Sequence, residues 1–189
     1  MFAVCVTTRP WRAASPAGSA DITDSDCVSG ARCTRSRLVP FDDASGDRLR
    51  DWVGLDRHTF FDATRVSILP MGFCFPGAVK GKGDRPPIPL CAETWRDQFL
   101  SALREIQLTL VIGQYAQAWH LGDEAGASLT EIVRQWQQYG NALIPMPHPS
   151  SRNNIWLKKN PWFETDLEPE LRRRVALALN HTGLSGGSR

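Results

Sequence analysis

Hydrophobic positions recur with regular spacing from about residue 38 onward and show no such order before it. Residues 47–53 place their apolar side chains on one helical face and precede Gly54, a residue that commonly ends helices. Residues 66–69 and 108–112 are short runs in which all but one residue are apolar, and they predict buried strands. The chain therefore reads as alternating helices and strands after its first segment.

The second half continues the alternation. Ser128 and Glu131 form a capping-box pattern, and apolar residues follow it at helical spacing. Three further helices are expected at residues 92–106, 115–121 and 167–179, and one further strand is expected at residues 142–146. Apolar strands that alternate with amphipathic helices predict an α/β fold, a three-layer α/β/α arrangement around a short central parallel sheet.

The composition fits one soluble domain. The 189 residues carry a net charge of +2, with 42% hydrophobic and 22% charged residues, and no run approaches the length of a membrane span. The amino terminus lacks a signal-peptide pattern, and the five cysteines are irregularly spaced. We expect a cytoplasmic monomer with a non-matching, disordered segment at residues 1–37, a folded domain at 38–180 and a flexible tail at 181–189.

The loop after residues 142–146 carries the clearest chemistry. It reads Pro147-His148-Pro149-Ser150-Ser151-Arg152-Asn153-Asn154. In sheets of this kind, ligands bind beyond the carboxyl ends of the strands. The two prolines restrict the backbone around the histidine, and the Ser, Arg and Asn residues that follow can donate hydrogen bonds to phosphate. The simpler alternative is a surface loop whose histidine has ordinary partners.

Several blocks, in matching order along the chain, together resemble the uracil-DNA glycosylase superfamily. The His148–Asn153 block matches its second signature, and the Arg-Asn version is similar to the single-strand-selective branch. The blocks at residues 39–47, 70–77 and 153–163 resemble bacterial members of the iron–sulfur type. This resemblance implies an enzyme that flips uracil out of DNA and hydrolyses its N-glycosidic bond.

The resemblance also assigns roles to individual residues. His148 would donate a hydrogen bond to the departing uracil, and Phe41 would stack on the flipped base unless it is an ordinary core aromatic. Asn153 would contact the base, and the loop beyond it would wedge into the gap in the stack. The DNA-binding residues would be Pro149, Ser150, Ser151, Arg152, Lys158 and Lys159.

Iron–sulfur-type relatives hold a 4Fe-4S cluster with four cysteines. Cys74 and Cys91 stand at positions like the later pair of ligands, but the chain has no Cys-x-x-Cys for the earlier pair. We therefore expect an incomplete cluster or none in this chain. The alternative for these two cysteines is a pair of idle thiols.

The superfamily's first signature, a water-positioning loop after the first strand, has no counterpart before residues 39–41. One hypothesis is that residues 1–37 are translated out of frame. We then expect the first strand to be missing or disrupted and the chain to be poorly soluble. No amide side chain stands at residues 68–72 to read uracil, and Asp42 and Asp43 are interpreted as helix caps rather than as bases that activate water.

The sequence leaves open whether this chain is catalytically active. The chief alternative to a glycosylase is a catalytically inactive remnant of the fold that binds nucleic acid through its basic loop. A third alternative is a metal or redox module built on Cys74 and Cys91.

Overall fold

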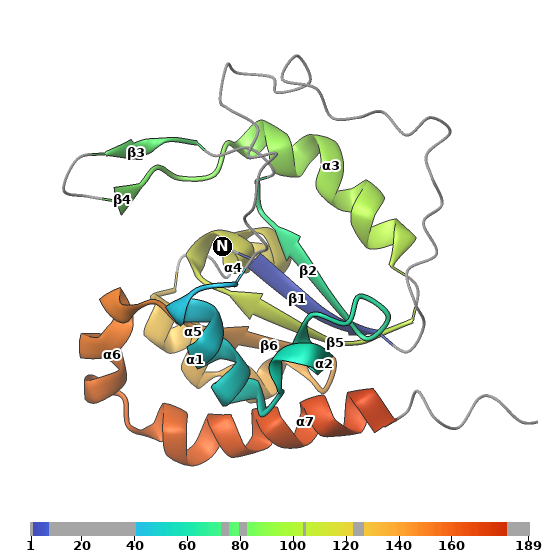
Figure 1. Cartoon of the computed structure of the whole chain (residues 1–189). Helices are drawn as coiled ribbons and strands as arrows, with labels where there is room; N and C mark the ends of the chain where they lie inside the picture. Colours follow the sequence, from blue (N-terminus) through green and yellow to red (C-terminus); the bar gives the residue numbers. More distant parts are fainter. Residues whose placement is uncertain are drawn as a thin grey trace, which may run out of the picture.

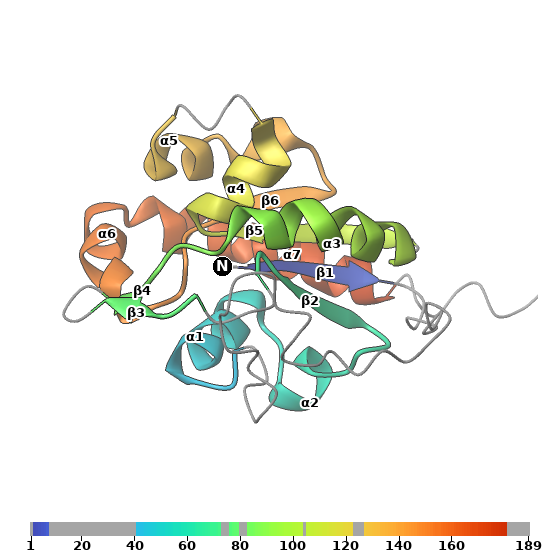
Figure 2. The ribbon, with the colours of Figure 1, turned by 90° about the horizontal axis from the view of Figure 1, so that it is seen from above.

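The computed structural model describes residues 2–7, 41–72, 76–79, 83–103, 105–122 and 127–180. Its centre is a four-stranded sheet with the order β2-β1-β5-β6, accompanied by a small separate hairpin, β3-β4 (Figures 1 and 2). The strands are β1 (Phe2–Thr7), β2 (Val66–Pro70), β3 (Ala78–Val79), β4 (Gly83–Asp84), β5 (Ile106–Ile112) and β6 (Leu143–Met146).

Helices cover both faces of the sheet, which gives the expected three layers (Figure 1). Side chains of α1 (Ala44–Val53) and α7 (Glu168–Asn180) form the larger core with one face. Residues of α3 (Pro89–Ala102) and α4 (Gln114–Leu121) pack on the other face. The remaining helical elements are α2 (Arg57–Phe60), α5 (Leu129–Arg134), η3 (Trp136–Tyr139), η4 (Ser151–Asn153), α6 (Asn154–Lys159) and η5 (Phe163–Leu167).

Strand β1 corrects two expectations. It pairs with β2 on one side and with β5 on the other, and both pairings are antiparallel. The sheet is therefore mixed, because β5 and β6 are parallel, and the central strand expected to be missing is supplied by Phe2–Thr7. Consecutive residues Val4, Cys5 and Val6 are all buried, since both faces of this strand are covered.

The sequence does not predict this strand, because a six-residue apolar run is short and occurs in a segment without periodicity. Its backbone nonetheless provides hydrogen-bond partners for two neighbouring strands, β2 and β5. This pairing stabilises the strand although the sequence around it is irregular. Residues 8–40, which include most of the segment expected to be disordered, and the tail at 181–189 lie outside the described residues.

The other predicted elements are confirmed with shifted ends. The capping box is present, with Ser128 and Glu131 bonded reciprocally at the start of α5. Helix α1 begins earlier than its apolar pattern because Asp43 caps it, and α3 begins at Pro89, where proline's fixed φ suits a first turn. Within the described residues, no helix is long and apolar enough to cross a membrane.

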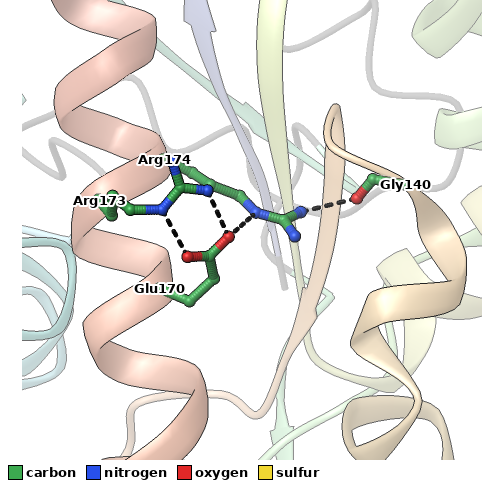
Figure 3. A network of polar contacts seen from close by, with 4 residues as sticks. All are labelled: Gly140, Glu170, Arg173 and Arg174. Carbon is green, nitrogen blue, oxygen red and sulfur yellow. Dashed lines mark hydrogen bonds and ion pairs between the residues drawn. The ribbon is translucent and has the colours of Figure 1, made fainter.

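Arg173 and Arg174 of α7 both bond to Glu170 of the same helix (Figure 3). Glu170 accepts hydrogen bonds from Arg173 and Arg174, and these contacts lower the pKa of Glu170 to about 2. Arg174 also donates to the Gly140 carbonyl at 2.6 Å and lies over the Trp136 ring. This network ties α7 to the turn that precedes β6.

The position of β1 predicts the reactivity of Cys5. Its side chain is fully buried in the sheet, and burial raises the pKa of its thiol above the ordinary value. We expect a maleimide to leave Cys5 unmodified in the native protein while it modifies the half-buried Cys91. Peptide mapping by mass spectrometry after a timed reaction measures both sites, with a denatured sample as the control. Labelling of Cys5 as fast as in the denatured sample would contradict the placement of β1.

Candidate functional site

The carboxyl ends of β2, β5 and β6 lie at one edge of the sheet, and the amino end of the reversed β1 lies there too. Figure 2 shows α6 at this same end. The Met146 carbonyl, at the end of β6, accepts hydrogen bonds from the Gly113 amide and from Nε2 of Gln117, both at 3.0 Å. The start of the His148 loop is therefore fixed by α4 and by the turn that precedes it.

His148 is half-buried between two prolines, Pro147 and Pro149, of the same loop. The backbone N–H of Ser150 donates to Nδ1 of His148 at 3.2 Å. Because Nδ1 accepts this bond, the ring proton of the neutral imidazole resides on Nε2. The loop thus presents Nε2–H of His148 as a hydrogen-bond donor.

The electrostatics keep this ring neutral. Burial lowers the pKa of His148 to about 4, the positive charges of the amino terminus and of Arg152 act in the same direction, and Asp43 opposes them. At neutral pH the imidazole is therefore uncharged. It can donate its Nε2–H in a hydrogen bond to a developing anion while the ring itself carries no positive charge.

Two side chains hold the loop closed around this histidine. Nδ2 of Asn153 donates to the His148 carbonyl at 2.7 Å. From α1, Nη1 of Arg48 donates to the Ser150 carbonyl at 3.3 Å and to Oδ1 of Asn154 at 2.8 Å. The amide donor of Asn153, predicted to contact the base, is thus engaged within the loop. Sequence reasoning missed Arg48, because no local pattern connects a helix residue with a loop about one hundred positions later.

Phe41 lies beside His148 in the turn that leads into α1. The two ring centroids are 6.1 Å apart with a 32° tilt, and the Phe41 ring packs edge-on to Phe60. The Phe41 side chain is only 6% exposed and belongs to the core. The structure therefore brings together the two residues that the sequence singled out, while the packing of Phe41 also fits its alternative as a core aromatic.

The Phe41 backbone adopts the left-handed region, with φ at 63°. For a residue with a side chain this conformation costs on the order of 1–3 kcal/mol, so the surroundings must hold it in place. A Cβ added to Gly46 would lie 1.6 Å from the Phe41 carbonyl oxygen, which shows how closely that carbonyl approaches α1.

The outer side of the site is basic. The exposed residues there are Ser151, Arg152, Lys158 and Lys159, together with Ile155, whose side chain is 68% exposed. Trp156, between them, turns inward and donates from Nε1 to the Thr130 hydroxyl at 2.8 Å. Helix α6 therefore presents cations and one apolar side chain outward while its aromatic residue anchors it.

The two aspartates after Phe41 have structural partners. Asp43 caps α1 by accepting a hydrogen bond from the Gly46 amide at 2.9 Å, as the sequence predicted. Asp42 pairs with Arg57, and this contact lowers the pKa of the Asp42 carboxyl.

The cysteines described by the structure do not provide the donor set of an iron–sulfur cluster. Cys91 lies on α3, Cys5 lies within the sheet beside Thr109 and Arg96, and Cys74 falls outside the described residues. Nowhere in the described ranges do three or more His, Cys, Asp or Glu residues gather as metal ligands would. A four-iron cluster normally takes four thiolates, and the described residues include two cysteines, which lie on different elements.

Comparison with known protein families shows what the chain is similar to. A family model described as the uracil DNA glycosylase superfamily matches residues 31–172. The matched range contains Phe41, the His148 loop and α6, but not β1. The site built from the geometry therefore lies within the part of the chain that the family model matches.

The neutral state of His148 predicts its titration. We expect the ring of His148 to titrate near pH 4, with Nδ1 unprotonated above it, in NMR spectra of the ring nitrogens. His120, whose pKa is also lowered to about 4 by burial and by Arg96, is the internal comparison. Titration of His148 near pH 6.5 would contradict the burial and the tautomer.

The same shift predicts acid sensitivity. Between pH 6.5 and pH 4 the unfolded chain binds more protons than the folded one, so the free energy of unfolding falls as the pH falls through this window. Urea denaturation at about pH 7 and about pH 5 measures the loss. We expect a smaller loss for His148→Gln than for the unchanged chain, because one of the two shifted groups is removed. An equal loss in both would show that His148 does not contribute.

Proposed function

Since the chain belongs to the uracil DNA glycosylase superfamily, a superfamily of DNA repair enzymes, we propose that it removes uracil, or a related damaged base, from DNA by hydrolysing the N-glycosidic bond. The single observation that supports this most strongly is the neutral His148, whose ring proton lies on Nε2 because Ser150 donates to Nδ1, and whose Nε2–H has no partner among the described residues. DNA is the partner that the family implies.

The proposed mechanism uses His148 as an electrostatic catalyst. As the glycosidic bond breaks, the base leaves with its bonding electrons and negative charge grows on a carbonyl oxygen of uracil. Nε2–H of His148 donates to that oxygen and stabilises the transition state more than the ground state. A neutral donor suits this role, since it remains available across the whole neutral pH range.

The basic outer side of the site would hold the DNA backbone. Ser150, Ser151 and Arg152 follow His148 closely and offer hydroxyl, amide and guanidinium donors to the phosphates beside the flipped nucleotide. Lys158 and Lys159 extend the positive charge along α6. Ile155, exposed between these two groups, is the side chain proposed to enter the gap that the flipped base leaves in the stack.

A second candidate function is DNA binding without base release. One observation favours it: Asp42 and Asp43 already have structural partners, and Nδ2 of Asn153 is bonded to the His148 carbonyl. Both carboxylates and one amide donor are thus engaged in contacts that support the turn and the loop rather than the chemistry. This candidate keeps the basic loop and α6 but assigns no turnover to His148.

Single-turnover release of uracil from an oligonucleotide with one deoxyuridine tests the proposal. We expect release by the unchanged chain and a rate about 10²–10³-fold lower for His148→Ala, the usual effect of removing one oxyanion donor. His58→Ala, which removes an exposed histidine of α2, is the matched control and should retain the rate. Binding of the DNA without release by any of the three proteins would support the second candidate instead.

A further inference from the structure

Arg50 is a buried cation on α1. Its residue is 7% exposed, in contrast to the exposed Asp47 one turn earlier, with which its Nη2 forms an ion pair. Its Nη1 donates to the Phe41 carbonyl at 3.0 Å. The guanidinium therefore joins the turn that carries Phe41 to the helix that follows it.

Two aromatic rings enclose the same guanidinium. Its central carbon lies 5.6 Å from the centroid of Phe60 and 5.4 Å from that of Phe61. Such cation–π contacts hold a guanidinium in place while its edge remains free to donate in the plane. Phe60 in turn packs edge-on to the Phe41 ring. Arg50 thus contacts the Phe41 backbone directly and the Phe41 ring through one neighbour.

Gly46 lies against the Phe41 carbonyl on the side away from Arg50. The Phe41 carbonyl oxygen lies so near Gly46 that a methyl group there would overlap it. The carbonyl is accordingly confined between the glycine backbone and the Arg50 donor. Any rotation of Phe41 out of its left-handed conformation has to break the bond to Arg50. This confinement fixes the direction of the Phe41 ring next to His148.

We propose that Arg50 is the positioning residue that sets the Phe41 ring beside His148 as the surface on which the flipped base stacks. The inference rests on the function proposed above and adds a residue to it. Arg50 touches neither base nor DNA. It acts by holding the strained Phe41 backbone in the conformation that places the ring.

The test compares three variants. Arg50→Met keeps much of the side-chain volume but removes the donor to Phe41, and Gly46→Ala pushes the same carbonyl from the other side with every charge intact. Arg57→Met is the control, because Arg57 is exposed and makes a cation–π contact with the same Phe61 ring at 5.1 Å. Urea denaturation first establishes that each variant is folded.

The first readout is independent of activity. The ring of Phe41 lies 6.1 Å from that of His148, so its ring current affects the His148 ring signals in NMR spectra. We expect these signals to shift in Arg50→Met and Gly46→Ala and to stay in place in Arg57→Met. If Arg50→Met does not fold, Gly46→Ala gives the same readout. Unmoved His148 signals in the folded variants overturn the proposal, whether or not the chain is active.

The second readout measures stacking. We compare the affinity for DNA with 2′-fluoro-2′-deoxyuridine, whose glycosidic bond resists cleavage, with that for DNA with a tetrahydrofuran abasic site. The unchanged chain should prefer the base-containing DNA by about tenfold, as expected for one stacked base. Arg50→Met should lose this preference, and its single-turnover rate should fall by about 10²-fold, as for a misplaced catalytic surface. Arg50→Lys, which retains one donor, should recover part of both.

The outcomes separate the two proposals. In one outcome, the unchanged chain shows neither uracil release nor a preference for base-containing DNA, while Arg50→Met still shifts the His148 signals. The glycosylase function then fails, and Arg50 is left with a structural role in positioning Phe41. If the unchanged chain shows both and Arg50→Met keeps the preference, the glycosylase function stands and the role of Arg50 in stacking is overturned.

Discussion

The pairing of β1 along both of its edges is the interaction on which the rest of the structure depends. Its backbone bonds to β2 on one side and to β5 on the other, so it joins β2 to the parallel pair of β5 and β6. Its buried residues lie beneath helices on both faces, with Val4 and Val6 in the core that α1 and α7 share. Without this strand, the carboxyl ends of β2 and β5 would not be held in register, and α1 and the His148 loop would lose their common support.

On that support the site is assembled from two distant segments. The turn at Phe41 and helix α1 come from the first third of the chain, and the His148 loop comes from the last third. Arg48 and Arg50 lie two residues apart on α1 and contact different segments of the site. Arg48 bonds to the His148 loop, and Arg50 bonds to the Phe41 carbonyl. One helix therefore controls the distance between the two neighbouring rings of the site.

Local patterns were sufficient for most of the fold. The apolar runs of β2, β5 and β6, the capping box at Ser128 and the cap at Asp43 are all short-range signals, and the structure contains each of them. The His148 loop was recognisable because its residue types stand next to one another. Strand β1 was not, because a six-residue strand acquires its stability from partners sixty or more positions away. The roles of Arg48 and Arg50 are not predictable from local pattern for the same reason, since each depends on contacts between segments.

The reversed orientation of β1 also has a consequence for the order of folding. Phe2 pairs with Pro70 and with Ile112, so β1 cannot complete its second edge until more than one hundred further residues have been made. Contacts of such long sequence separation are slow to form, because the loop they close must first lose its entropy. During synthesis, the valines of this strand remain without their final neighbours. The nascent chain therefore has a long interval in which it is a substrate for chaperones, or for aggregation with other copies, before the sheet is complete.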